Sequence, residues 1–446
     1  MEFIIKISQF LLSLSLLIVL HELGHFIPAK LFKTKVEKFY LFFDVKFSLF
    51  KKKIGDTVYG IGWLPLGGYV KIAGMIDESM DKEQMAQPPQ PWEFRSKPAW
   101  QRLIIMLGGV TVNFILAYVI YVAISFAYGD ATVSVESLED GYWIENPTLI
   151  DAGFETGDKI VAINETPIVN DSDIGLNIIK AESITIARSG QQQTINLPED
   201  FLGQLSSSGS KELFELRVPF MVAQVADSSV NVEKDIKEGD IITAINGEEL
   251  QYFDELKSIV NDMKNETVTV QILRDNETFE TELMLDETGA FGIIPFKNHP
   301  KFEELGYYDV TRIDYSFGES FGAGWQKFTK TISNYGDQLA AIFNPSTGAY
   351  KGLGGFKAIY DQFSSVWSWP YFWGLTAFLS IMLAILNLLP IPALDGGHVM
   401  FLLYEMVSGR KPSEKFLERA QVIGFFILIA LVLFANGNDI FKALTN

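Results

Sequence analysis

The 446-residue chain contains no cysteine, only four histidines, and far fewer basic than acidic residues. The absence of cysteine excludes disulfides and thiolate metal ligands, although an oxidising compartment stays compatible with the sequence. The 36 Lys and Arg against 55 Asp and Glu give a formal net charge of −19, which argues against nucleic acid as a partner. Any metal site in this chain therefore has no thiolate ligand.

Apolar residues make up 48% of the chain and gather in blocks long enough to cross ~30 Å of hydrocarbon. The first block lacks a small-residue cleavage site after a short apolar core, so we interpret it as a retained span and not as a signal peptide. Pro28 follows it and is expected to end that helix. The four predicted spans are Ile4 to Leu20 with its continuation to Pro28, Leu103 to Tyr128, Tyr371 to about Leu403, and Val422 to Phe434 with its flanks.

Basic residues cluster in two of the loops between these spans. By the positive-inside bias both loops are cytoplasmic, which places the two termini and the long segment 129–370 on the other side of the bilayer. The loop between spans one and two, residues 32–100, is expected to form a membrane-associated β-hairpin or loop. The basic residues are Lys30, Lys33, Lys35, Lys38, Lys46, Lys51, Lys52 and Lys53 around the first loop, and Arg410, Lys411, Lys415 and Arg419 in the second.

The segment between spans two and three contains an internal repeat. Gly157 to Asn164 (GDKIVAIN) is echoed by Gly239 to Gly247 (GDIITAING), a turn followed by a β-rich run. The pattern resembles PDZ domains, which hold peptides by strand addition at a sheet edge. The second copy has Val232 to Glu238 in place of the usual Ala-Gly turn, which puts its peptide affinity in doubt more than its fold. Both copies could instead be spacers or a size filter.

These patterns predict a multi-pass α-helical membrane protein with a split core of about four transmembrane helices and two inserted extracytoplasmic PDZ-like α+β domains. Ser206 to Ser210 is a natural flexible break between the two copies. Residues 300–370 are aromatic and Gly-rich, which favours interfacial helices. The predicted parts are residues 1–128, the first PDZ-like domain 129–209, the second 210–298, a linker with interfacial helices 299–370, and the second half of the core 371–446.

A His-Glu-Leu-Gly-His motif lies at the end of the first span. On a helix His21 and His25 are one turn apart, so both imidazoles can share one metal while Glu22 lies alongside. Asp395 in span three is the candidate third ligand, because an unpaired carboxylate would be costly there and a metal would supply the countercharge. Pro390 and Pro392 break the helix just before it, at a matching depth near the cytoplasmic face.

Taken together, these motifs resemble the site-2 protease family of intramembrane zinc metalloproteases, and specifically the bacterial regulator-of-sigma-E protease group. The resemblance covers the whole chain in order. It rests on the His21 to His25 motif, on Asn387 to His398 (NLLPIPALDGGH), on the PDZ-like repeats, on Pro65 to Lys71 (PLGGYVK) and on Ser96 to Arg102 (SKPAWQR).

The resemblance implies a role for each matching position. His21, His25 and Asp395 would bind Zn2+, Glu22 would be the general base, and Asn387 would contact the substrate backbone or the oxyanion. An unwound substrate would pair as an added strand with Gly67, Gly68, Tyr69 and Val70. Asn113 would support the core or make only a helix–helix hydrogen bond, and the family's usual proline near it is absent. His398 could support the site from behind Asp395, whereas His299 is expected at an ordinary surface.

The expected function is zinc-dependent intramembrane endopeptidase activity in regulated intramembrane proteolysis. The substrates would be single-span membrane proteins, such as an anti-sigma factor or remnant signal peptides, within the bacterial cytoplasmic (inner) membrane. One alternative is a non-proteolytic PDZ-containing scaffold with a structural zinc, and another is a peptidase acting on soluble peptides. Glu22 argues against the scaffold, because a structural site needs no general base and usually has four protein ligands.

Overall fold

The computed structural model describes residues 2–65, 67–75, 87–208 and 213–445. The predicted break at Ser206 to Ser210 and the Pro65 to Lys71 motif therefore lie partly outside the described residues. The chain divides into two compact units. The first comprises residues up to 129, 314–340 and from 353 onward, and the second comprises 130–313 and 341–352.

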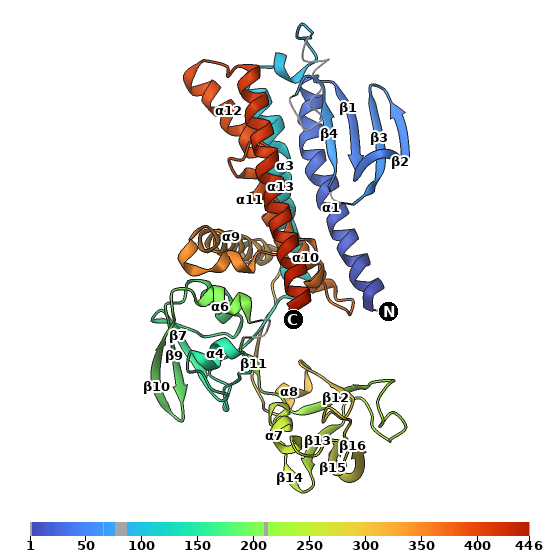
Figure 1. The fold of residues 1–446 in the computed structure, drawn as a ribbon, viewed down its shortest axis with the longest axis vertical. Coiled ribbons are helices and arrows are strands. Elements are labelled where there is room, and N and C mark those ends of the chain that lie inside the picture. The colour runs from blue at the N-terminus through green and yellow to red at the C-terminus, as the bar shows by residue number, and fades with distance from the viewer. Residues whose placement is uncertain (1, 66, 76–86, 209–212, 446) are drawn as a thin grey trace. The chain divides into compact units, whose positions relative to one another are not determined.

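The first unit is built on four helices that are long and apolar enough to cross a membrane. In Figure 1 they run alongside one another. This number agrees with the four spans expected from hydropathy. The helices are α1 (Glu2–Leu31), α3 (Ala99–Tyr128), α11 (Trp369–Leu388) and α13 (Glu414–Thr445).

Two helix boundaries differ from those expected. Pro28 does not end the first helix, because α1 continues to Leu31 with Pro28 in its last turn. A proline cannot bond to the carbonyl four residues before it, here that of Gly24. The Gly24 carbonyl oxygen instead faces Gly108 of α3. A Cβ added to Gly108 would lie only 1.9 Å from that oxygen. Span three is also shorter than expected: α11 ends at Leu388 and a separate helix α12 (Asp395–Ser408) follows.

A four-stranded sheet follows α1 and lies beside its C-terminal half (Figure 1). The strand order is β2-β3-β1-β4, so β4 is an edge strand, and among the described strands its one partner is β1. The rings of Phe26 in α1 and Phe39 in β1 pack edge to face, with centroids 5.4 Å apart. The strands are β1 (Val36–Leu41), β2 (Phe43–Ile54), β3 (Thr57–Leu64) and β4 (Tyr69–Ile72), and the 3-10 helix η1 (Phe94–Ser96) precedes α3.

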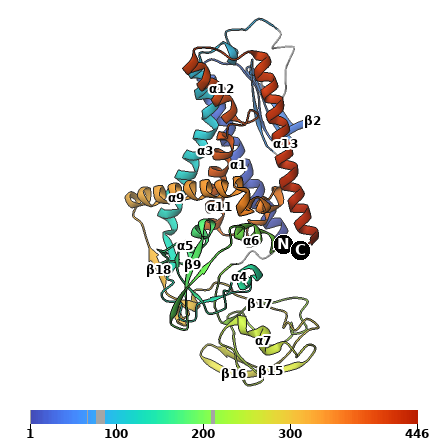
Figure 2. The same ribbon diagram turned by 60° about the vertical axis from the view of Figure 1, so that its left-hand side comes forward.

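The long helix α9 (Phe317–Phe343) packs across the C-terminal part of α3, as two views show (Figures 1 and 2). A Cβ on Gly324 would lie 2.6 Å from the Val122 side chain, and Lys327 donates a 2.8 Å hydrogen bond to Ser125. The exposed face of α9 carries apolar side chains, as expected for an interfacial helix. Contact of α9 with lipid stays a prediction. The short helix α10 (Phe356–Asp361) packs against α1 and α13.

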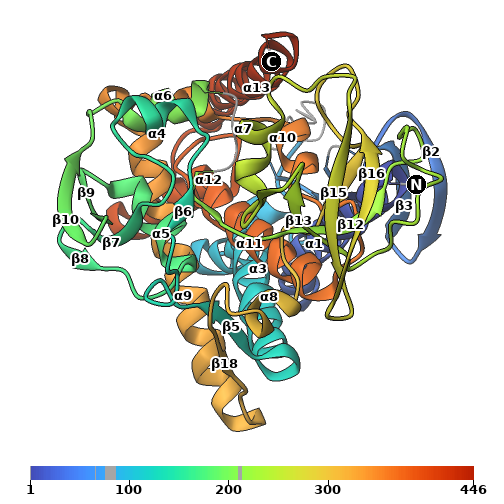
Figure 3. The same cartoon turned by 90° about the horizontal axis from the view of Figure 1, so that it is seen from below.

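The second unit contains two larger sheets, with strand orders β10-β9-β7-β8 and β16-β15-β13-β12-β17. Figure 3 views the second of them from below. A strand that the sequence did not predict, β18, pairs with β5. The strands are β5 (Asp130–Val133), β6 (Tyr142–Trp143), β7 (Lys159–Ile163), β8 (Thr166–Pro167), β9 (Ser183–Arg188), β10 (Gln191–Asn196), β11 (Glu215–Leu216), β12 (Phe220–Val225), β13 (Ile241–Ile245), β14 (Glu248–Glu249), β15 (Thr267–Arg274), β16 (Glu277–Met284), β17 (Ile293–Pro295) and β18 (Val310–Ile313).

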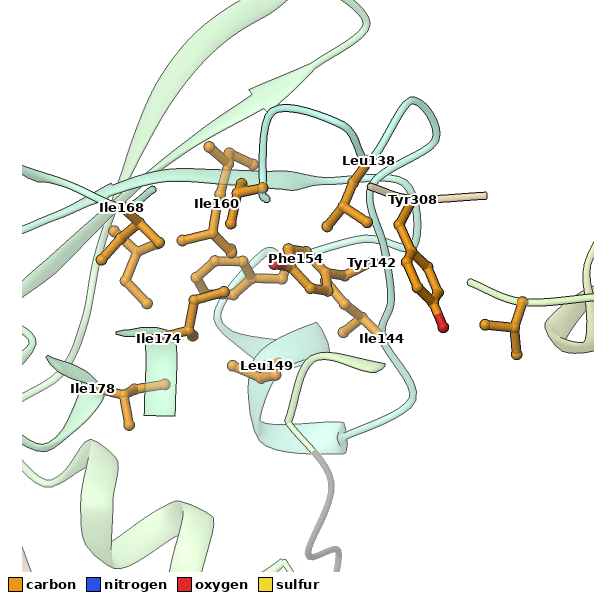
Figure 4. Packing of buried hydrophobic residues seen from close by; sticks show 14 of the residues in the cluster. Leu138, Tyr142, Ile144, Leu149, Phe154, Ile160, Ile168, Ile174, Ile178 and Tyr308 are labelled. Atoms are coloured by element: carbon orange, nitrogen blue, oxygen red, sulfur yellow. The ribbon is translucent and has the colours of Figure 1, made fainter. Parts of the chain in front are cut away.

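Short helices cover these sheets and enclose two apolar cores. The larger core gathers buried side chains such as Tyr142, Phe154 and Ile160 (Figure 4). The helices are α4 (Pro147–Asp151), α5 (Ser172–Asn177), η2 (Ile178–Lys180), α6 (Phe201–Ser207), η3 (Phe253–Glu255), α7 (Leu256–Val260), α8 (Lys301–Glu304), η4 (Pro345–Thr347) and η5 (Ala349–Gly352). Because α6 reaches Ser207, the first two residues of the predicted flexible break are helical.

The two copies of the sequence repeat share the same local structure. In the first copy the buried Asp158 carboxylate accepts two hydrogen bonds from the Arg188 guanidinium, at 2.6 and 2.8 Å. In the second copy Asp240 accepts two from Arg274, at 2.7 Å each. The Gly-Asp turn of each copy is thus fastened to a later strand by an arginine. The assignment of the copies as PDZ-like domains stays a prediction.

Candidate metal centre

Three glycines bring α1 and α3 into close contact at the His-Glu-Leu-Gly-His motif. A Cβ on Gly24 would lie 2.3 Å from the Gly108 carbonyl oxygen, and one on Gly109 would lie 2.4 Å from Nε2 of His25. Small residues at such positions let helix backbones approach in a membrane. The glycine inside the motif therefore sets the distance between the helices, and Gly109 leaves room for the imidazoles.

Hydrogen bonds from α3 orient both imidazoles. Nδ1 of His25 lies 2.8 Å from the Ile105 carbonyl oxygen and must donate to it, which leaves Nε2 free to bind a metal. Nδ1 of His21 lies 3.2 Å from the side-chain amide of Asn113, whose buried Oδ1 has no partner among the described residues. If that amide is turned, Oδ1 accepts a hydrogen bond from Nδ1–H of His21, and Nε2 of His21 becomes available as well.

Asp395 is placed by the break between α11 and α12. The helix α11 ends at Leu388, Pro390 and Pro392 lie in the non-helical segment that follows, and α12 begins at Asp395 itself. Gly396 and Gly397 allow its first turn to pack against this break, because a Cβ on Gly396 would lie 2.3 Å from the Leu388 carbonyl oxygen. The carboxylate consequently stands at a helix N-terminus, where the macrodipole favours negative charge.

The three side chains converge on one point. Oδ2 of Asp395 lies 3.4 Å from Nε2 of His21 and 3.3 Å from Nε2 of His25, and the two Nε2 atoms are 3.3 Å apart. A tetrahedral zinc with bonds of about 2.0–2.1 Å places its ligand atoms about 3.3–3.4 Å apart. The buried Oδ2 atom makes no hydrogen bond within the described part of the chain. The donor set and its spacing therefore fit a zinc ion with three protein ligands.

Glu22 and the edge strand β4 line a cavity of about 440 Å³ together with the three candidate ligands. The Glu22 carboxylate interacts with the backbone of Val70, a residue of β4. A Cβ added to Gly68 would lie 2.5 Å from the Ile18 side chain and 2.7 Å from the Tyr40 carbonyl oxygen. Its lack of a side chain thus allows the sheet to approach α1 beside the candidate metal ligands.

The structure brings most of the predicted site residues together. Gly68, Tyr69 and Val70 line the cavity, and the amide of Asn387 lies 3.5 Å from Nε2 of His21. Gly67 is not among the lining residues but lies against the ring of Phe43, which lines the cavity. Pro390 and Pro392 form the break before Asp395, as described above.

The other two histidines of the chain lie outside the cavity that contains Glu22. His398 lines a different pocket with Arg102 and Glu405, so the structure does not place it in the cavity with Glu22. His299 belongs to the second unit, where its Nδ1 accepts a hydrogen bond from the Lys301 amide.

Some cavity residues were not expected from the sequence. Lys38, Phe43, Met75 and Met106 line the cavity, and the backbone of Ile105 orients His25. They come from separate segments, and no motif marks them. Only the long-range packing of α1, α3 and the sheet brings them to the site.

Comparisons with known proteins agree with this arrangement. The sequence profile of Peptidase family M50 matches residues 9–431. A Haemophilus influenzae protein named "Regulator of sigma E protease" is 26% identical over 99% of this chain and 100% of its own length. Proteins named "Putative zinc metalloprotease" match from Vibrio cholerae, 28% identical over 96% of this chain and 97% of the relative, and from Neisseria meningitidis, 26% identical over 98% of each.

The family match extends from α1 into α13 and so includes both segments that carry the candidate ligands. The zinc in the relatives' names, together with the cluster of two histidines and an aspartate, confirms the predicted cofactor. Because the match covers nearly the whole sequence, the chain belongs to Peptidase family M50, the site-2 protease family of zinc metalloproteases.

Proposed function

We propose that this chain is a zinc-dependent intramembrane endopeptidase that cuts the transmembrane segments of single-span proteins. The observation that carries the proposal is the position of Glu22, which lies beside the cluster of His21, His25 and Asp395 in a cavity edged by β4. The two histidines and the aspartate would hold the metal. Three protein ligands leave one position open, which is typical of catalytic zinc sites.

The metal and Glu22 divide the work of activating water. When bound, zinc supplies Lewis acidity that makes a water molecule lose its proton near neutral pH. Glu22 is the general base that accepts this proton and later delivers it to the leaving amine. Asn387, whose amide lies near His21, would donate a hydrogen bond to the substrate carbonyl oxygen as negative charge develops there.

The outer edge of β4 could bind an unwound substrate. A helical peptide has its amides engaged in its own hydrogen bonds, and opening it in lipid would leave them without partners. Since β1 is the one strand that pairs with β4 in the described part of the chain, the other edge of β4 can hydrogen-bond an extended chain by strand addition. Tyr69 and Val70 of this strand line the cavity, so a substrate added there would pass close to Glu22.

The proposed substrates follow from the family. A relative named "Regulator of sigma E protease" supports anti-sigma factors as one class, and remnant signal peptides are another. We place the protein in a bacterial cytoplasmic membrane, with the two termini and the second unit outside and Glu22 near the cytoplasmic side. The two PDZ-like copies would then exclude proteins with large ectodomains or bind exposed peptide ends.

Cleavage of a tagged single-span protein by the full chain in detergent tests this proposal. The wild type should cut within the membrane segment, as mapped by mass spectrometry, and Glu22→Gln should retain zinc but not cut. Undiminished cleavage by Glu22→Gln would refute the catalytic assignment. Cuts confined to soluble peptides would favour a surface peptidase, and zinc retention with no cleavage by either protein would favour a scaffold.

A further inference from the structure

The hairpin formed by β2 and β3 carries an apolar surface outside the proposed peptidase site. Seven large apolar side chains on it are between 39% and 66% exposed. The strand register sets Phe50 beside Ile61, and the rings of Phe47 and Trp63 stack with centroids 5.8 Å apart. We call these residues the hairpin surface: Val45, Phe47, Leu49, Phe50, Ile54, Ile61 and Trp63.

Four lysines border the hairpin surface. Lys46 and the consecutive Lys51, Lys52 and Lys53 are all exposed on β2, and no ion pair involves them in the described part of the chain. The hairpin also has two carboxylates, that of Asp44 on β2, which forms an ion pair with Lys38, and that of Asp56 in the turn that follows. In a protein whose formal net charge is −19, the hairpin is thus a local concentration of positive charge.

The register of the sheet places Lys51, Lys52 and Lys53 at the level where the first span ends. Ile54, next to the three lysines, pairs with Thr57, whose hydroxyl oxygen accepts a 2.9 Å hydrogen bond from Lys30 in the last turn of α1. Gly68, toward the opposite end of the sheet, lies against Ile18 near the middle of α1. Lys51, Lys52 and Lys53 therefore stand at the level where α1 ends, whereas Lys46 and the apolar residues around it lie toward the level of Ile18.

We propose that the hairpin surface binds acidic phospholipids at the boundary of the leaflet nearest the His21–Asp395 cluster. Exposed aromatic and aliphatic side chains beside lysines are typical of surfaces that rest in the headgroup layer. Each lysine near an anionic leaflet contributes attraction that a neutral lipid lacks. Next to these lysines, the edge of β2 that no described strand pairs with also has backbone groups that need partners, which headgroups and their water supply and hydrocarbon does not.

Lipid bound at this surface would act on the sheet that edges the cavity. Strand order β2-β3-β1-β4 connects the lysine-bearing strand to β4 through two intervening strands. The lipid would hold one end of the sheet at the boundary while β4 stays against α1. Binding of lipid does not depend on peptidase activity, so the two proposals can fail separately.

The absence of cysteine allows a single fluorescent label to test this. Asp56→Cys places the label in the turn beside the lysines, and energy transfer to headgroup-labelled lipid is measured on the full chain in detergent micelles. Phosphatidylglycerol should bind more tightly than phosphatidylcholine, and Lys51→Gln, Lys52→Gln and Lys53→Gln together should weaken binding by about 10- to 100-fold. The control, Lys234→Gln, Lys257→Gln and Lys264→Gln in the second unit, removes the same charge and should change nothing.

Three results would overturn the proposal. Equal binding of the two lipids would show that charge plays no part. An unchanged affinity in the hairpin variant, or an equal loss in the control variant, would show that these lysines are not the site. Energy transfer that vanishes as labelled chains associate would assign the hairpin surface to contact with a second copy of the chain.

Discussion

Replacing Gly24 by alanine tests whether the close contact of α1 and α3 builds the metal centre. The new Cβ would lie 2.3 Å from the Gly108 carbonyl oxygen, so the helices must separate by about 1 Å to reach ordinary contact. His21 and His25 move with α1, whereas Asp395 belongs to α12, which packs on α3. Metal–ligand distances in zinc sites vary by only about 0.2 Å. A helix displacement of about 1 Å is several times larger than this variation.

We therefore expect Gly24→Ala to bind zinc about 10- to 100-fold more weakly, the loss typical when ligands lose their support. Overpacking should also lower the free energy of unfolding by about 1–3 kcal/mol. Zinc affinity is measured by competition with a chelator on the purified full chain. Gly374→Ala in α11 is the matched control, because a Cβ there meets nothing within 4 Å. Wild-type zinc affinity in Gly24→Ala would refute the reasoning.

Further substitutions test the support of the site and of the repeats. Asn113→Ala removes the amide beside a candidate zinc ligand and should weaken zinc binding about 10-fold, measured by the same competition. Gly68→Ala should push β4 away from α1 and reduce cleavage while zinc affinity is kept, which comparing kcat/KM with zinc content will reveal. Arg274→Gln leaves the buried Asp240 carboxylate without its partner and should cost about 2 kcal/mol in thermal or urea unfolding. The hydrogen bond from the Arg274 guanidinium also holds the pKa of Asp235 below its usual range. The stability from this pair is therefore complete above the ordinary carboxyl pKa and is lost as the pH falls through the lowered pKa, and the variant should lack that dependence.

The sequence predicted the elements that depend on local pattern. Hydropathy was sufficient to find the four spans, because a run of about 20 apolar residues is the length that a helix needs to cross the hydrocarbon layer. Asp395 could be paired with the histidines because an ionisable residue in a span needs a partner. The structure brings its Oδ2 to within 3.4 Å of both imidazoles. The edge strand was also expected near Gly68, from the family's motif.

The sequence could not predict contacts that depend on tertiary packing. Gly24 and Gly108 are far apart in the chain, and no local sequence pattern indicates that these two glycines contact each other. The continuation of α1 past Pro28 has the same origin, since the carbonyl that the proline leaves unbonded faces α3. Asn113 could be interpreted as a helix–helix contact until its amide was found beside His21.

The central claim is that one zinc joins the two halves of the chain while Glu22 performs the chemistry. Zinc content and cleavage of a single-span substrate, measured side by side on Glu22→Gln and Asp395→Ala, test it most directly. We predict that Glu22→Gln retains one zinc per chain and loses cleavage, whereas Asp395→Ala loses both. Full zinc content in Asp395→Ala, or cleavage at the wild-type rate by Glu22→Gln, would contradict the claim.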